Sequence, residues 1–243
     1  MKQEFELNTP VSPIPISPAK VQETFIAAMQ RVYLWMALGL LVTAGVALYV
    51  STSEAALNFI FGNTIVFFGL IIGEFALVIA ISAAIARLSP AAALALFFGY
   101  AALNGATLAI IFLAYTGSSI VLTFGVTASL FGIMSIIGYT TKQDLTNWGP
   151  ILFIGLIGFL IGSVANFFLN SPILQWILTY VGIGIFLGLT VYDTKRIKTM
   201  TMGAIIQDEG TAVAKIGILG ALRLYLDFIN LFLLLLRIFG RRR

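Results

Sequence analysis

Cysteine and histidine are both absent from the 243 residues of this chain. Their absence excludes disulfides, thiol nucleophiles, metal sites built from thiolate or imidazole, and every mechanism that uses histidine as an acid or base. Charged residues are scarce as well, at 10% of the chain, whereas a soluble domain carries about 25%. The chemistry of this protein must therefore come from a few carboxylates, amides, hydroxyls and basic side chains.

Apolar residues dominate the composition instead. Hydrophobic residues make up 60% of the chain and the mean hydropathy is +1.03, values that indicate an all-α polytopic membrane protein. Membrane spans occupy almost the whole length, which leaves no room for a second, soluble domain. We attribute the net charge of +4 and the pI of 9.4 to basic loops that face the cytoplasm, and expect no binding of nucleic acid.

Seven apolar runs have the length of about 17–25 residues that a helix needs to cross a bilayer. They cover residues 32–50, 65–85, 91–114, 120–139, 151–168, 173–192 and 216–239. Together they predict one seven-helix transmembrane domain over residues 32–239, followed by a basic tail at 240–243. Residues 1–31 are polar and rich in proline, so we expect a mobile N-terminal tail in which residues 21–30 can form a short amphipathic helix.

The distribution of basic residues predicts the orientation. The N-terminal tail and the second, fourth and sixth connections hold nine: Lys2, Lys20, Arg31, Arg87, Lys142, Lys195, Arg196, Lys198 and Lys215. The first, third and fifth connections hold none, so the positive-inside rule places the N-terminus in the cytoplasm. The seventh run ends in a basic cluster at residues 237–243. We expect this run to cross fully, although a re-entrant path would keep the cluster inside.

The seventh run carries a polar stripe on an otherwise apolar helix. Gly220, Arg223, Asp227 and Asn230 follow one another by three, four and three residues, which places them on one face. At about 1.5 Å per residue, Asp227 lies roughly 16 Å into the run, near the middle of a bilayer. A carboxylate there costs about 2.5–3.5 kcal/mol, so it is expected to face a cavity or a partner. The alternative is a purely structural ion pair between Arg223 and Asp227.

A second acid, Asp193, ends the sixth run. Two carboxylates that meet in a low-dielectric site cannot both be charged cheaply, so Asp193 and Asp227 are expected to share one proton. Raising the pH removes this proton and makes the pair repel, which predicts a pH-operated latch that admits a hard cation such as Ca²⁺. The acids meet only if the sixth helix continues past Lys195 or the seventh is tilted or broken. Otherwise Asp193 is a solvated interfacial acid beside Lys195 and Arg196.

Other polar residues are candidates for supporting roles. Glu74, near the middle of the second span, is either bonded to a neighbouring helix or part of an ion path. Asn104 and Asn166, in the third and fifth spans, are expected to join helices. Arg87, at the cytoplasmic end of the second span, either reaches the two acids or anchors the helix at the interface.

Glycines at four-residue spacing predict places where helix backbones approach closely. The pairs are Gly69 and Gly73, Gly158 and Gly162, and Gly184 and Gly188. The six runs before the seventh also suit two half-bundles of three helices, an architecture that no repeat in the sequence demonstrates.

The end of the sixth run and the seventh run resemble the Bax inhibitor-1 family, also called the transmembrane Bax inhibitor motif family. The resemblance rests on Tyr192-Asp193 and on residues 224–232, Leu-Tyr-Leu-Asp-Phe-Ile-Asn-Leu-Phe, followed by Arg237 and Phe239-Gly240. The polar N-terminus, Glu74, Arg87, and Asn166 shortly before Ser171-Pro172 extend it to the whole layout.

This resemblance implies a fold in which the C-terminal helix is central and two three-helix layers wrap around it. It also implies a pH-sensitive Ca²⁺ leak channel in which Asp193 and Asp227 form the sensor and close the pore. Arg87 would contact these acids in a way that changes with gating, and Glu74 would be a pore-side acid. Arg223, Asn230 and Asn166 complete the predicted site, and we expect neither enzymatic activity nor a cofactor.

Two other functions would use these residues differently. A presenilin-like intramembrane aspartyl protease also carries Tyr-Asp on one helix and an Asp on the next. Here, however, Asp227 follows Leu-Tyr-Leu instead of Gly-x-Gly, and no Pro-Ala-Leu turn is present. The other alternative is a membrane regulatory protein without transport of its own, with quality-control or death-regulatory proteins as partners. The short chain without organelle signals favours a bacterial plasma (inner) membrane.

Overall fold

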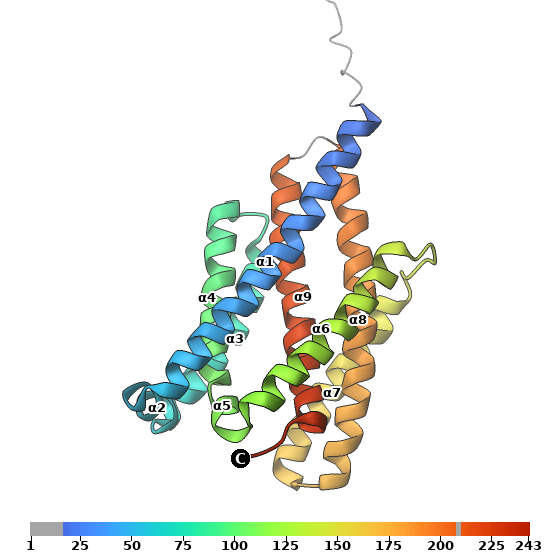
Figure 1. Cartoon of the computed structure of the whole chain (residues 1–243). Helices are drawn as coiled ribbons and strands as arrows, with labels where there is room; N and C mark the ends of the chain where they lie inside the picture. Colours follow the sequence, from blue (N-terminus) through green and yellow to red (C-terminus); the bar gives the residue numbers. More distant parts are fainter. Residues whose placement is uncertain (1–16, 208–209) are drawn as a thin grey trace, which may run out of the picture.

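Helices account for almost all of the described chain. The computed structural model describes residues 17–207 and 210–243, and within these ranges it contains nine helices (Figure 1). They are α1 (Pro18–Thr52), α2 (Glu54–Phe61), α3 (Thr64–Ala84), α4 (Pro90–Leu108), α5 (Ile110–Ala114), α6 (Gly117–Thr140), α7 (Trp148–Leu169), α8 (Pro172–Ile206) and α9 (Gly210–Phe239). Seven segments of this described chain are long and apolar enough to cross a membrane, α4 and α5 counting as one. The chain is an integral multi-pass membrane protein.

Polar residues in the connections fix where several helices begin. The side chains of Ser53, Asn63, Ser89 and Ser171 accept hydrogen bonds from backbone amides in the first turns of α2, α3, α4 and α8. Proline is the first residue of both α4 and α8, where its missing amide hydrogen costs nothing. The turn residues that separate the apolar runs therefore act as helix caps.

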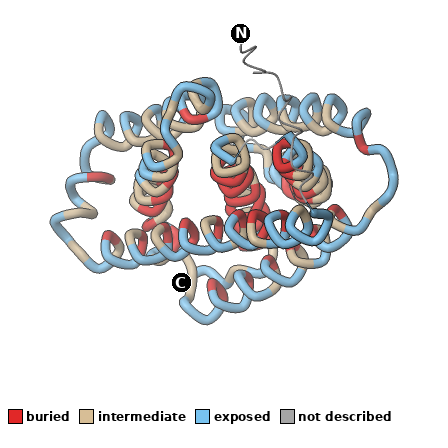
Figure 2. The backbone as a smooth tube through the Cα atoms, turned by 90° about the horizontal axis from the view of Figure 1, so that it is seen from above, coloured by how far each residue is buried: buried red, intermediate tan, exposed pale blue. Residues whose placement is uncertain are grey.

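The helices lie in three layers around α9 (Figures 1 and 2). The middle layer holds α4, α9 and α8, while α1 and α6 cross one face of it and α3 and α7 lie on the other. Four helices pack against α9, namely α1, α4, α6 and α8. The expected all-α fold of seven membrane helices is confirmed, and α9 is central as expected. The two three-helix layers expected around it are two groups of three helices. One group is α1, α3 and α4, and the other is α6, α7 and α8.

These two groups are arranged alike but run in opposite directions. In each, the first helix lies in the layer of α1 and α6, the second in the layer of α3 and α7, and the third beside α9. Because each group crosses three times, the second group starts from the side on which the first ends. This layout matches an inverted repeat of the kind found in transporters.

Burial is concentrated on α9 (Figure 2). In the most apolar 18-residue stretch of α9, 72% of the residues are buried, compared with 6% in that of α3 and 0% in that of α7. The helices of the outer layer thus turn most of their surface to lipid, whereas α9 is enclosed by protein. An acid on α9 is therefore shielded from lipid by the surrounding helices.

Two helices are longer than the expected spans. Residues 18–31, expected in the tail, are helical and belong to α1, and residues 1–16 lie outside the described part. At the other helix, α8 continues to Ile206 instead of ending at residue 192. The helices extend because side chains such as Phe25 and Ile205, beyond the apolar runs, still pack in the core. Each has 35 residues and thus a length of about 52 Å, more than a hydrocarbon core of about 30 Å.

The last helix runs from one end of the bundle to the other, as expected for a full crossing. Near its start, Lys215 Nζ donates to the carbonyl oxygen of Ala86, in the α3–α4 connection, at 2.7 Å. After its end, Thr116 donates its amide to the carbonyl oxygen of Arg241 at 2.9 Å, which joins the tail to the α5–α6 connection. The C-terminal tail therefore lies at the end opposite to the first residues of α1 (Figure 1).

The glycine pairs mark close contacts in only two places. A side chain at Gly162 or Gly188 would lie 2.8 Å from a leucine of the facing helix, where α7 packs on α8. Around the other four glycines, at positions 69, 73, 158 and 184, nothing within the described chain lies within 4 Å of such a side chain, so the prediction is wrong there. Closer approaches occur at Gly105 against α1 and Gly138 against α8. The difference is that these four glycines lie on faces of α3, α7 and α8 that do not pack against a neighbouring helix of the described chain.

Candidate functional site

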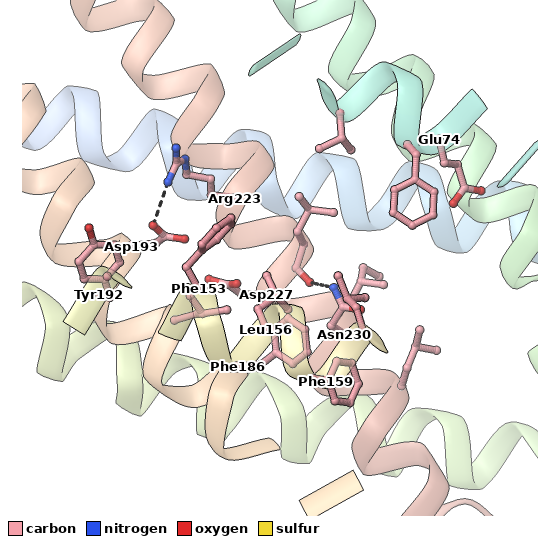
Figure 3. Close-up of a pocket in the computed structure, with 18 of the residues that line it drawn as sticks. Glu74, Phe153, Leu156, Phe159, Phe186, Tyr192, Asp193, Arg223, Asp227 and Asn230 are labelled. Carbon is pink, nitrogen blue, oxygen red and sulfur yellow. Dashed lines mark hydrogen bonds and ion pairs between the residues drawn. The ribbon is translucent and has the colours of Figure 1, made fainter. Parts of the chain in front are cut away.

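A cavity of about 770 Å³ lies beside α9, between α3 and α4 on one side and α7 and α8 on the other. Phenylalanine, leucine, isoleucine and valine make up half of the residues that line it. Three acids are set into this wall: Asp193, Asp227 and Glu74 (Figure 3). Two cations, Arg196 and Arg223, also border it. We call this space the central cavity.

Asp193 lies on α8 and is held by an ion pair. Arg223, on α9, donates from Nη1 to Asp193 Oδ1 at 3.2 Å. Asp193 is only 6% exposed, because α8 continues past Lys195 and packs along α9. The alternative of a solvated interfacial acid is therefore wrong. The alternative pair between Arg223 and Asp227 is wrong too, since Asp193 is the carboxylate that Arg223 meets within 4 Å in the described chain.

Asp227 lies one helical turn beyond Arg223 in a more enclosed place. Its exposed fraction is 4%, and its Oδ2 has no hydrogen-bond partner among the described residues. Most buried polar atoms in proteins do have such a partner, so an orphaned carboxylate oxygen calls for a functional explanation. A proton or a cation is the kind of species that would satisfy this oxygen.

The structure brings Asp193 and Asp227 together. Both carboxylates lie at one end of the central cavity, with Glu74 at the other end (Figure 3). The described residues include no group of three carboxylate, imidazole or thiolate ligands, whereas a resident Ca²⁺ takes six to eight oxygens. The two aspartates alone therefore supply fewer oxygens than a resident Ca²⁺ takes.

Comparison with known proteins assigns the chain to a family. A family model described as inhibitor of apoptosis-promoting Bax1 matches residues 24–243. The chain belongs to the Bax inhibitor-1 family. Among its relatives, the inner membrane protein YbhL of Escherichia coli strain K12 is 50% identical over 229 residues, which cover 94% of this chain and 96% of that protein. An uncharacterized protein of Borreliella burgdorferi is 43% identical over 223 residues, or 92% and 94% of the two chains.

Glu74 of this Bax inhibitor-1 family member is bonded to the neighbouring helix. Thr107 donates its hydroxyl to Glu74 Oε1 at 2.7 Å, and Asn104 donates from Nδ2 to Oε2 at 3.3 Å. Both partners lie on α4, while the acid itself is on α3 and borders the central cavity. The bond to a neighbouring helix is therefore confirmed, and the role of Glu74 in an ion path stays a prediction.

A hydrogen-bond network continues from Glu74 to the central helix. Tyr225, on α9, donates its hydroxyl to Asn104 Oδ1 at 3.0 Å and lies 2.6 Å from Thr43 Oγ1 on α1. The chain of bonds from Glu74 through Asn104 and Tyr225 to Thr43 connects α3, α4, α9 and α1. It reaches α9 two residues before Asp227, so it fixes the part of the helix that carries this acid.

The remaining predicted residues are spread more widely. Arg87 is exposed in the α3–α4 connection and forms no ion pair with either aspartate in the described chain. Asn230 borders the central cavity, but its Nδ2 donates to the carbonyl oxygen of Leu226 on its own helix at 2.8 Å. Asn166 accepts a hydrogen bond from the Ser171 amide at 3.1 Å and so closes the α7–α8 turn, away from the cavity. Arg223 takes the position beside the acids that the family resemblance assigned to Arg87.

Two residues of this region were not predicted from the sequence. Tyr225 stands inside the seventh-run motif, and a fully buried hydroxyl on a central helix needs a partner, which is a signal that could have been used. Thr43 gives no such signal, because it is one of several hydroxyl residues in apolar runs. Its role depends on how α1 crosses α9.

Proposed function

We propose that this Bax inhibitor-1 family protein is a pH-sensitive calcium leak channel, gated by a proton that Asp193 and Asp227 share. The observation that supports it is two buried acids at one end of a cavity beside the central helix. One of them has a cationic partner, and the other has an oxygen without a partner among the described residues. We take the protein to act without enzymatic chemistry and without a cofactor.

The proposed closed state is electrically neutral. With one proton between the two aspartates, the positive charge of Arg223 and the single remaining negative charge cancel. A neutral cluster in an apolar wall offers a hydrated Ca²⁺ no compensation for the water it must lose. The shared proton also holds α8 and α9 together at this level, which keeps the path closed.

Raising the pH opens the proposed latch. Loss of the shared proton leaves two negative charges against the one positive charge of Arg223, so the cluster carries a net charge of −1. The two carboxylates then repel each other and attract a cation. Glu74, at the other end of the central cavity, offers a second carboxylate along the path. Calcium flux is therefore expected to increase with pH.

The orientation and location belong to the same proposal. The nine basic residues of the tail and of the even connections favour a cytoplasmic N-terminus. The inner membrane named for the E. coli relative favours a bacterial inner membrane for this chain as well. In this orientation the aspartate pair lies toward the cytoplasmic end, and the arginine tail lies on the other side.

An intramembrane protease is a weaker candidate for the same acids. Asp193 is already paired with Arg223, which leaves it less free to activate water. Leu224 and Tyr225, shortly before Asp227, are 0% exposed, so a substrate backbone has no access there.

Calcium flux into liposomes tests the proposal. The purified protein is reconstituted with a trapped calcium-sensitive dye, and entry is followed as a function of pH. We expect flux to rise with pH in the native protein and to stay low in Asp193→Asn and Asp227→Asn, which cannot form the charged pair. Asp144→Asn, which removes an exposed acid of the α6–α7 connection, is the matched control and should behave as the native protein.

Two outcomes would contradict the proposal. Native flux and native pH dependence in both cavity variants would show that the acids do not gate the path. Absence of flux in every protein, with the fold intact by circular dichroism, would favour the regulatory role through partner proteins.

A further inference from the structure

A second, smaller cavity of about 200 Å³ lies between the end of α3, the cytoplasmic part of α8 and the start of α9. Three cationic side chains border it: Arg196, Lys215 and Arg223. The rest of its wall is mostly apolar, with residues such as Ile85 and Met200. We call this cavity the basic pocket.

The positive charges of the basic pocket are only partly compensated. Arg223 pairs with Asp193. Lys215 donates to a neutral acceptor, the carbonyl oxygen of Ala86, at 2.7 Å. Arg196 is exposed and has no ion pair within 4 Å among the described residues. The two cations without a carboxylate partner in the described chain, Arg196 and Lys215, repel each other across one small space, so the arrangement favours an anion between them.

The basic pocket lies where phospholipid headgroups are expected. Its residues come from the end of α3 and from the parts of α8 and α9 next to the basic connections. Nearby, Lys198 on α8 donates to the carbonyl oxygen of Tyr139 at 2.7 Å, so this neighbouring cation is bound to the end of α6 and does not reach the pocket. Basic pockets between membrane helices on the cytoplasmic side suit anionic headgroups.

We propose that the basic pocket binds a phosphate group with a net negative charge, supplied by the headgroup of an anionic phospholipid in the cytoplasmic leaflet. The planar guanidinium of Arg196 matches two phosphate oxygens, and the ammonium of Lys215 can hold a third. The apolar wall suits the glycerol and first methylene groups of a lipid. Free inorganic phosphate shares the headgroup chemistry without these apolar contacts. This binding does not rest on the proposed channel function, although Arg223 borders both cavities; the choice of the cytoplasmic leaflet rests on the proposed orientation.

Native mass spectrometry of the delipidated full chain in detergent tests the inference. Phosphatidylglycerol, phosphatidylcholine or inorganic phosphate is added, and bound adducts are counted. We expect phosphatidylglycerol to be retained in preference to phosphatidylcholine. In Arg196→Gln and Lys215→Gln its retention should fall by about tenfold each, because a charge-assisted contact is lost.

Three further variants control for charge and fold. Lys142→Gln removes an exposed cation of the α6–α7 connection and should retain phosphatidylglycerol as the native protein does. Lys215→Arg keeps the charge and should restore binding. Asp208 and Glu209, in the α8–α9 connection, lie outside the described residues, and replacing both by their amides should leave binding unchanged or stronger.

The possible outcomes distinguish a lipid headgroup from free phosphate as the bound group, and they include the results that would overturn the inference. If inorganic phosphate by itself displaces phosphatidylglycerol, the pocket binds phosphate, but the lipid headgroup is not required as its source. Equal retention of phosphatidylglycerol and phosphatidylcholine would overturn the inference. So would equal retention of phosphatidylglycerol in the native protein and in the Arg196→Gln/Lys215→Gln double variant. None of these readouts depends on calcium flux, so the inference can fail while the channel proposal stands, and the reverse.

Discussion

Arg223→Gln is the substitution that tests the aspartate pair most clearly. Glutamine keeps much of the length and polarity of the side chain but removes the positive charge that lies 3.2 Å from Asp193. Without this charge, the deprotonated form of the aspartate pair loses its main compensation. The pair then holds its shared proton to higher pH, so the opening of the path is expected to move in the same direction.

The size of this effect follows from the exposure of the pair. At 3.2 Å, two unit charges interact by about 5 kcal/mol with an effective dielectric constant of about 20. The side chain of Arg223 is 37% exposed and that of Asp193 is 9% exposed, so water screens one side of the pair. Exposed pairs contribute about 0–1 kcal/mol, and loss of one partner of a buried pair costs about 3–5 kcal/mol. A value of about 1.5–3 kcal/mol lies between these limits and corresponds to about 1–2 pH units.

The assay is the pH profile of calcium entry into liposomes. Arg223→Gln should shift the midpoint of the profile upward by about one to two pH units, with a similar maximum once the pair is fully deprotonated. Arg87→Gln is the control, because this exposed arginine forms no ion pair with the acids in the described chain. An unchanged midpoint in Arg223→Gln, or an equal shift in Arg87→Gln, would refute this reasoning.

Three further predictions concern packing and topology. Tyr225→Phe leaves Asn104 short of a partner and should lower the free energy of unfolding by about 1–3 kcal/mol, whereas the exposed Tyr180→Phe should not change it in chemical denaturation. Gly138→Ala places a methyl group against the backbone of α8 and should cost about 1–3 kcal/mol, while Gly125→Ala, with nothing within 4 Å in the described chain, should be neutral in the same measurement. Reporter fusions at the two termini should lie on opposite sides of the membrane; reporters on the same side would contradict the full crossing of α9.

Much of the fold could be predicted from the sequence, because bilayer thickness sets a length that apolar runs reveal directly. The seven spans follow from these apolar runs, and the central position of the last helix follows from the family resemblance. The lengths of α1 and α8 could not be predicted in this way. Their extensions contain polar residues and are stabilised by contacts with other helices, which hydropathy does not record.

The candidate site, like the fold, could be predicted from the sequence only in part. A carboxylate at mid-membrane depth indicates a cavity or partner, so Asp227 could be recognised from its position alone. The partner of Arg223 could not, because spacing along α9 favoured Asp227, one turn away, over Asp193 on another helix. Arg87 is a further example: its place at the end of the second span allowed either a contact with the acids or an anchor at the interface, and only the folded arrangement shows that it pairs with neither aspartate in the described chain.

Infrared spectroscopy of the aspartate carboxyl groups tests the shared proton most directly. Difference spectra of the purified protein, recorded while the pH is raised through the range in which flux increases, report the carbonyl stretch of a protonated carboxyl group. We predict one such band that disappears over the same range as the latch opens, that is absent in Asp227→Asn, and that persists to higher pH in Arg223→Gln. A band that is unchanged in Asp227→Asn, or the absence of any protonated aspartate below the flux transition, would contradict the account.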